Sequence, residues 1–309
     1  MLREIPWTIV RGFCMGAADI VPGVSGGTIA LVFGIYRRLV ASIRAGSSAI
    51  GHLIRLDIAG FRRWLGAVEW SFLLPLLLGI GLAVLALAGL IERLLNDHPI
   101  EMAALFFGLI AGSIVIVWQL LTNRDAKRFG IMITVGAVVF VVLGIREGTT
   151  EETVGQLSEP ELWAFFLAGA IAICAMILPG ISGSFLLVML GMYGPVLGAV
   201  NDRDLVALLV FLVGATIGLA LFSQGLHWAL TEHYDSVMAA LIGLMVGSIR
   251  VLWPWPDGLN TTRLGSPDER IGPVIAIAVT AFVGVLVVNA IAKRTEHRTT
   301  ADEVDELHT

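Results

Sequence analysis

Six long apolar stretches constrain this chain more than any other feature of its sequence. They lie near residues 71–91, 100–121, 130–145, 206–226, 236–253 and 272–291. A helix needs about 20 apolar residues to cross a bilayer core, where every backbone polar group must be bonded internally. Only 15% of the 309 residues are charged, against about 25% in a typical soluble domain. The sequence therefore predicts an all-α polytopic membrane protein.

Two further apolar regions, near 7–43 and 161–200, are interrupted by a motif that occurs twice. The first copy reads "DIVPGVSGGTIALVFGIY" and the second "ILPGISGSFLLVMLGMY". A shift of 157 positions aligns Pro22, Gly23, Ser25, Gly26, Gly34 and Tyr36 with Pro179, Gly180, Ser182, Gly183, Gly191 and Tyr193. A shift of 135 aligns "GLIAGSIVIVW" with "GLMVGSIRVLW". Because the matches keep their order, we predict two copies of one unit.

Each unit is predicted to be a broken hairpin followed by three spanning helices. Proline cannot continue a helix without losing a hydrogen bond, and glycine favours a turn. The arms, roughly Pro6–Val21 and Ser25–Val40 in the first copy, would each be about 24 Å long, short of a core of about 30 Å. We interpret each broken region as a re-entrant helical hairpin, which makes the two units inverted repeats. Arms that span fully would instead give ten spans, and charge counting does not separate the two arrangements.

The chain is accordingly divided into two membrane repeats, residues 1–145 and 161–292, joined by an acidic external loop at 146–160. Residues 293–309 form a predicted cytoplasmic tail. With a cytoplasmic N-terminus, 14 of the 20 Lys and Arg residues lie inside, which favours cytoplasmic N- and C-termini. The segment 44–70 occurs only in the first repeat and mixes basic with apolar residues. We interpret it as an interfacial amphipathic helix, with an ordinary cytoplasmic loop as the alternative.

The repeated motif is suited to binding an anion. A helix N-terminus has partial positive charge and unpaired amides, a serine there can cap it, and glycines let a ligand approach. In an inverted pair, the two turns would meet near the bilayer midplane and bind one anion between them. The alternative is that the small residues serve only close helix packing. The predicted binding residues are Ser25, Gly26, Gly27, Thr28, Ser182, Gly183 and Ser184, and the predicted structural breaks are Pro22, Gly23, Pro179 and Gly180.

Asp19 and Arg250 are the charged residues that we consider for function. An ionisable side chain within a membrane segment is costly and indicates a functional role. We hypothesise that Asp19 couples proton uptake to anion binding, or that it only caps the turn at Ser25. Arg250 has a guanidinium suited to phosphate, or it is a helix-end arginine that reaches the interface. Arg37 and Arg38 are interpreted as cytoplasmic anchors.

Several classes of function lack their usual sequence signals. HExxH, CxxC, P-loop and GxSxG motifs are absent, and the six histidines have no metal-ligand spacing. We therefore expect no metal, no cofactor and no enzymatic activity, since neither copy of the motif has a nucleophile or base beside it. No basic groove for nucleic acid is visible. Arg11 interrupts the first apolar stretch, so a cleavable signal peptide is not expected.

The strings "GAADIVPGVSGGTIALVFGIYRRLV", "LPGISGSFLLVMLGMY" and "GSIRVLW" resemble the bacterial polyprenyl-phosphate transporter family. The resemblance extends over about residues 8–292, although Arg37 stands where the family pattern has an acidic residue. It implies a flippase of the bacterial cytoplasmic membrane that returns undecaprenyl phosphate from the outer to the inner leaflet for cell-envelope and peptidoglycan synthesis. The partner implied is thus a polyprenyl phosphate lipid.

Two other functions remain open on the residues alone. A secondary transporter for a small soluble anion would use the same motif, but it would need a closed aqueous cavity. A lateral opening between helices would instead favour a lipid substrate. An intramembrane enzyme such as a lipid phosphatase would need the nucleophile or base that both motifs lack.

Overall fold

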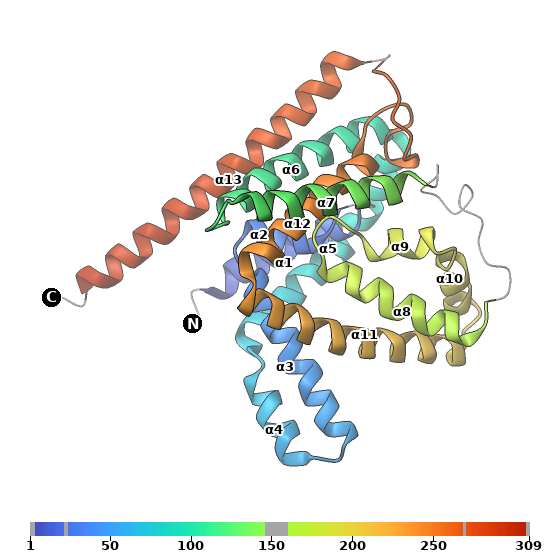
Figure 1. Ribbon diagram of the computed structural model, residues 1–309, viewed down its shortest axis with the longest axis vertical. Helices are drawn as coiled ribbons and strands as arrows, with labels where there is room; N and C mark the ends of the chain where they lie inside the picture. The colour runs from blue at the N-terminus through green and yellow to red at the C-terminus, as the bar shows by residue number, and fades with distance from the viewer. Residues whose placement is uncertain (1–3, 22–23, 146–159, 268–269, 307–309) are drawn as a thin grey trace.

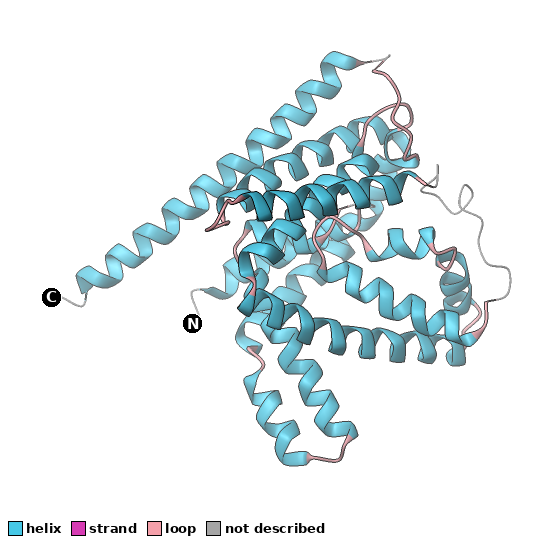
Figure 2. Cartoon of the chain, in the orientation of Figure 1, coloured by secondary structure: helices cyan, strands magenta, loops and turns pink. Residues whose placement is uncertain are grey.

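The computed structural model describes residues 4–21, 24–145, 160–267 and 270–306, and their regular elements are helical (Figures 1 and 2). The first half contains α1 (Ile5–Asp19), α2 (Gly26–Val32), α3 (Tyr36–Ile54), α4 (Ile58–Ala67), α5 (Trp70–Asp97), α6 (Pro99–Gln119) and α7 (Ala126–Gly144). The second half contains α8 (Leu162–Ile177), α9 (Gly183–Met189), α10 (Tyr193–Asn201), α11 (Leu205–Glu232), α12 (Tyr234–Ser248) and α13 (Ile271–Glu306). Two short 3-10 helices, η2 (Ile249–Leu252) and η3 (Gly258–Asn260), follow α12.

Six helices in the described residues are long and apolar enough to cross a membrane, as predicted. They are α5, α6, α7, α11, the continuous segment Tyr234–Leu252 formed by α12 and η2, and the part of α13 at Ile271–Ala290. These six helices coincide with the six apolar stretches of the sequence. The helix α13 continues to Glu306, so the segment predicted as a tail is largely a helical extension.

The broken regions differ from the prediction in one respect. We predicted a single second arm over Ser25–Val40, but α2 ends at Val32 and α3 begins at Tyr36, with Gly34 at a φ of 68° between them. The second half breaks in the same way at Gly191, with a φ of 70°, and α9 and α10 are bent by 107°. Glycine adopts positive φ without the steric cost that other residues incur.

The lengths of the first arms favour hairpins over ten full spans. The helix α1 has 15 residues and α8 has 16. At 1.5 Å per residue both are about 23 Å long, which is shorter than a hydrocarbon core of about 30 Å. Since the second arms are also interrupted, neither arm of either region forms a straight helix of spanning length.

Each half contains an equivalent close contact between two of its own helices. The helix α1 packs on α5, and α8 packs on α11. A Cβ atom on Gly12 would lie 2.1 Å from the carbonyl oxygen of Leu76, and one on Gly169 would lie 2.1 Å from that of Phe211. Gly169 follows Gly12 by 157 positions, and Phe211 follows Leu76 by 135. The reciprocal contacts also correspond, between Gly79 and Ile9 and between Gly214 and Phe166.

The last spanning helix of each half packs against the other half. The helix α7 packs on α12, and α13 packs on α6 (Figure 1). A Cβ atom on Gly108 would lie 2.1 Å from the carbonyl oxygen of Ala278, and one on Gly243 would lie 2.5 Å from that of Met132. Small residues allow such close approach of membrane helices. The third spanning helix of each half therefore packs on the second spanning helix of the other.

The segment that is unique to the first half consists of two helices rather than one. The C-terminal part of α3 and the whole of α4 project from the rest of the molecule (Figure 1), and no residue of α4 is buried. The helix α3 packs on α11, where the hydroxyl groups of Ser47 and Ser223 lie 3.2 Å apart. Arg38 of α3 forms an ion pair with Glu69, which holds the pKa of that carboxyl below its usual range. The interfacial position of this segment stays a prediction.

The close glycine contacts allow a matched test on one helix. Gly79→Ala places a Cβ atom 2.1 Å from the carbonyl oxygen of Ile9, whereas Gly81→Ala meets nothing within 4 Å. We expect Gly79→Ala to destabilise the protein by about 1–3 kcal/mol through overpacking. Gly81→Ala should leave stability unchanged or raise it by up to about 1 kcal/mol. Thermal unfolding of the purified variants in detergent measures both, and equal melting temperatures would contradict the packing.

Candidate functional site

The start of α2 is capped by two side chains. Ser25 is the N-cap residue, and its Oγ accepts a hydrogen bond of 3.1 Å from the amide of Gly27. The Oδ1 atom of Asp19 accepts one of 2.6 Å from the amide of Gly26. The expectation that the amides here are unpaired is therefore wrong for α2. The carboxylate of Asp19 and the hydroxyl of Ser25 already accept hydrogen bonds from the amides of Gly26 and Gly27. Pro22 and Gly23 lie outside the described residues.

Gly26 and Gly27 are required by the closeness of their neighbours. A Cβ atom on Gly26 would lie 2.6 Å from the Oδ2 atom of Asp19. A Cβ atom on Gly27 would lie 2.6 Å from the carbonyl oxygen of Ile177, which belongs to the second half. Real Cβ atoms do not tolerate such distances, so larger residues would push Asp19 or the second turn away.

The structure brings the two repeated turns into direct contact. The Oγ atom of Ser25 donates a hydrogen bond of 2.9 Å to the carbonyl oxygen of Leu178. The amide of Gly180 donates one of 3.1 Å to the Oγ1 atom of Thr28. Ser25 and Thr28 are fully buried. Residues more than 150 positions apart thus satisfy each other's polar groups at the centre of the fold.

The second turn has the same shape but different chemistry. Gly180 has a φ of 85°, and Pro179 beside it is buried. A Cβ atom on Gly183 would lie 2.6 Å from the side chain of Met176, which occupies the place that Asp19 has in the first turn. Ser182 is the N-cap residue of α9 but bonds no amide there, and its hydroxyl lies 2.9 Å from that of Ser184. The carboxylate is therefore an asymmetric feature of a paired site.

Arg250 lies on η2 rather than beside the turns. Its Nε atom donates a hydrogen bond of 3.0 Å to the carbonyl oxygen of Thr262, and its guanidinium lies 4.9 Å from the centre of the Phe140 ring. The next residue, Val251, packs against Phe185 of α9. Arg250 is thus close to the second hairpin, but its recorded contacts are with a loop and with α7. Its role in phosphate capture stays a prediction.

A groove that sequence reasoning missed leads to the second turn. It has a volume of about 1190 Å³ and is open to the outside of the molecule. Its lining includes Lys127 and His233, and also Leu178, Ile181 and Leu186 at and beside the second turn. The other walls are mainly apolar and come mostly from α8, α11 and α12. The small residues of these walls were visible in the sequence, as Ala170, Gly218, Gly225, Ala229 and Ala240.

The groove extends along about half of α11. Gly218 and His233 both line it and are 15 residues apart along α11 and its C-cap. At 1.5 Å per residue this separation is about 22 Å, against a hydrocarbon core of about 30 Å. The groove is therefore shorter than such a core is thick.

No group of three or more His, Cys, Asp or Glu residues in the described chain is placed to hold a metal ion. The two cysteines are free thiols within the apolar segments. The Sγ atom of Cys174 lies 3.7 Å from the carbonyl oxygen of Gly218, on the wall of the groove. Cys174 thus contributes to helix packing there.

Comparison with known proteins assigns the family. Residues 15–267 match the family described as undecaprenyl phosphate translocase-like. The chain belongs to this family. A polyprenyl-phosphate transporter of Vibrio cholerae is 42% identical over 265 residues, which are 85% of this chain and 82% of the relative. One of Staphylococcus aureus is 34% identical over 265 residues, 82% of this chain and 88% of the relative. No solved structure matches the chain.

The contact between the turns can be tested by removing one hydroxyl. Thr28→Val keeps the shape of the side chain but leaves the amide of Gly180 without its acceptor. We expect a loss of about 1–3 kcal/mol in stability, because the amide is buried. Thr216→Val is the control, since Thr216 is exposed and bonds only its own helix at Leu212. It should change stability by less than about 0.5 kcal/mol, and similar melting temperatures for both variants would refute the contact.

Proposed function

We propose that this chain moves polyprenyl phosphate between the leaflets of the bacterial cytoplasmic membrane and returns it from the outer to the inner one. The observation that supports this most is the open apolar groove that reaches the second turn, which is in contact with the first. Membership of the undecaprenyl phosphate translocase-like family points to the same substrate. In this proposal the protein binds and moves the lipid and performs no chemistry on it.

The groove suits the hydrocarbon tail of such a lipid. Its walls are mainly apolar and it is open to the outside of the molecule, so a prenyl chain can lie in it while staying in contact with the bilayer. A small soluble anion would need an enclosed aqueous cavity instead. Lys127 and His233, on connections that the predicted topology places on the cytoplasmic side, provide groups that attract or hydrogen-bond the phosphate where its path ends.

The two turns are proposed to bind the phosphate head. The groups that now join the turns are those that a phosphate would use, namely the hydroxyls of Ser25 and Thr28 and the amide of Gly180. A phosphate oxygen can also replace Asp19 at the amide of Gly26 once that carboxyl is protonated, since an amide bonds a charged acceptor more strongly than a neutral one. Head binding and turn contact would then be alternatives that exchange during transport. The proposed ligands from the second turn are Ser182, Gly183 and Ser184.

Asp19 is proposed to set when this exchange occurs. Its carboxylate accepts the amide of Gly26, so it stands where a phosphate oxygen would bind and repels it while both are charged. Protonation removes the repulsion and weakens the hydrogen bond to the amide, because a neutral acceptor is weaker than an ionised one. Proton uptake would therefore favour phosphate binding. We further propose that Arg250 assists capture of the head group on the outer side.

We propose that the inverted repeats allow the phosphate head to be exposed first to one side of the membrane and then to the other. The two halves make equivalent contacts at Gly12 and Gly169 and at Gly79 and Gly214, which supports two copies of one unit. With each hairpin entering from its own side and both termini cytoplasmic, the turns would meet between the leaflets. Each hairpin could then open its own side in turn.

Filling the groove tests the function directly. Purified protein in liposomes should move a fluorescent short-chain prenyl phosphate between leaflets, measured by its protection from a membrane-impermeant quencher. Gly225→Trp places a large side chain in the groove where an added Cβ meets nothing, so we expect intact folding and transport reduced several-fold. Gly81→Trp on α5 is the control, since Gly81 also has open space and lies outside the groove.

Wild-type protein that moves inorganic phosphate but not the lipid would refute the proposed function. Equal transport by the Gly225→Trp and Gly81→Trp variants would show instead that the groove is not the lipid path.

Proton coupling is tested with Asp19→Asn. Asparagine keeps an oxygen to accept the amide of Gly26 but cannot ionise. Because protonation is the step that frees the phosphate position, wild-type transport should rise as the pH falls, whereas the variant should show a flat pH profile. Transport by liposomes at a series of pH values measures both. If the variant keeps the full pH dependence of the wild type, Asp19 is not the proton site.

A further inference from the structure

The hydroxyl group of Tyr36 is buried without a hydrogen-bond partner. Tyr36 is the first residue of α3, and only 2% of it is exposed. Among the buried side-chain polar atoms of the described residues, its Oη and the Nε of Arg128 have no partner. A buried hydroxyl that has lost its bonds to water without replacing them is unfavourable. Phenylalanine would fill the same space without this cost, so the hydroxyl calls for a functional reason.

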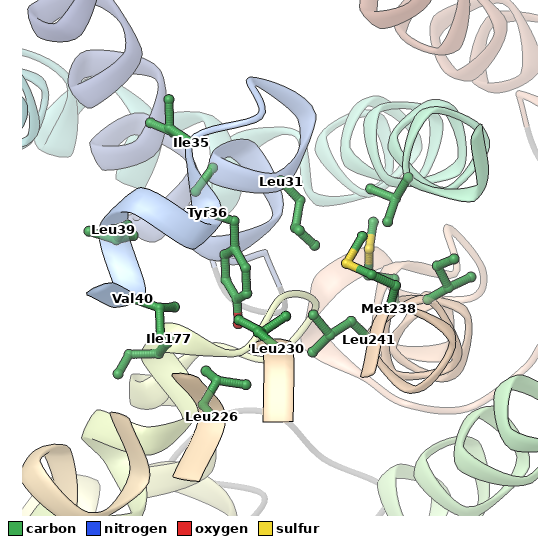
Figure 3. Close-up of a cluster of buried hydrophobic side chains, with 14 of the residues drawn as sticks. Leu31, Ile35, Tyr36, Leu39, Val40, Ile177, Leu226, Leu230, Met238 and Leu241 are labelled. Carbon is green, nitrogen blue, oxygen red and sulfur yellow. The ribbon is translucent and has the colours of Figure 1, made fainter. Parts of the chain in front are cut away.

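The hydroxyl of Tyr36 belongs to a packed cluster that also contributes to the groove wall. In Figure 3 the ring of Tyr36 points from α3 towards Leu226, Leu230 and Ile177, with which it shares one cluster of packed side chains. Leu226 and Leu241 belong both to this cluster and to the wall of the groove. Leu226 and Leu241 thus form an apolar layer that the Tyr36 cluster and the groove share.

The position of Tyr36 is coupled to the turn that meets the second half. It follows the break at Gly34, so the short helix α2 connects it to the capped start at Ser25. Ser25 in turn bonds the carbonyl oxygen of Leu178, which also lines the groove. The hydroxyls of Tyr36, Ser25 and Thr28 thus belong to one short stretch of chain, which contacts the groove-lining residue Leu178 through Ser25.

We propose that Tyr36 donates a hydrogen bond from Oη to the phosphate head of the substrate as the head passes between the groove and the turns. The proposal rests on the proposed function and adds a substrate ligand to it. It requires a state in which the apolar layer at Leu226 and Leu241 has moved aside. A phosphate monoester offers several acceptor oxygens, and a phenol can donate to one of them.

A neutral donor is suited to this passage. A cation at the same place would hold the head by charge and slow its departure, whereas a hydroxyl stabilises it without a net charge. The adjacent Arg37 does not take this role, since it is exposed and its guanidinium lies 5.4 Å from the centre of the Tyr234 ring. The surroundings of Tyr36 within the cluster are apolar.

Tyr36→Phe tests the inference, with Tyr234→Phe as the matched control among the three tyrosines of the chain. In the liposome assay with short-chain prenyl phosphate, we expect Tyr36→Phe to slow transport about tenfold, the effect of one hydrogen bond to a charged group. Its melting temperature should stay equal to that of the wild type or rise. Tyr234→Phe keeps the ring beside Arg37 and should leave transport unchanged.

Binding measurements separate this role from a purely structural one. Tyr36→Phe should weaken the binding of short-chain prenyl phosphate to the full chain but leave binding of the corresponding prenol, which lacks phosphate, unchanged. Wild-type rates and affinities in Tyr36→Phe would overturn the inference while leaving the proposed function intact. Wild-type protein that fails to move prenyl phosphate would overturn both.

Discussion

The fold depends on satisfying broken backbone far from water. Each half contains a turn between short helices, and unpaired amides or carbonyls in such a place would cost several kcal/mol each. The two turns solve this together, since Ser25 bonds the carbonyl of Leu178 and Thr28 accepts the amide of Gly180. Neither half can bury its turn in this way alone, which explains why the motif occurs twice in one chain.

The surrounding helices hold the two turns at this meeting point. Glycines such as Gly12 and Gly169 let the first arm of each hairpin lie against a spanning helix at backbone contact. The exchange of α7 and α13 between the halves interlocks them. The groove is left beside α8 and α11, and in the proposed function it is the way by which a lipid reaches the turns from the bilayer. Rigid packing around a contact that a phosphate can replace is consistent with a transporter that has two states.

The sequence predicted the spanning helices and the pairing of the turns, because apolar length and the recurrence of a short motif can be read directly from the residues. The break at Gly34 was missed although its repetition at Gly191 was visible, since a lone glycine in an apolar run also fits a continuous helix. The occupation of the amide of Gly26 by Asp19 was foreseen only as an alternative. The groove and the unpaired hydroxyl of Tyr36 arise between segments far apart in the chain, so no local sequence pattern predicts them.

The central claim is that two turns, one from each half, form a single phosphate site at the end of a lipid groove. An experimental structure of the full chain with a prenyl phosphate bound tests it most directly. The account predicts phosphate density between Ser25–Thr28 and Gly180–Ser184, with the prenyl chain along α11. Phosphate held elsewhere, or two turns that are separated by other helices with and without the lipid, would contradict it.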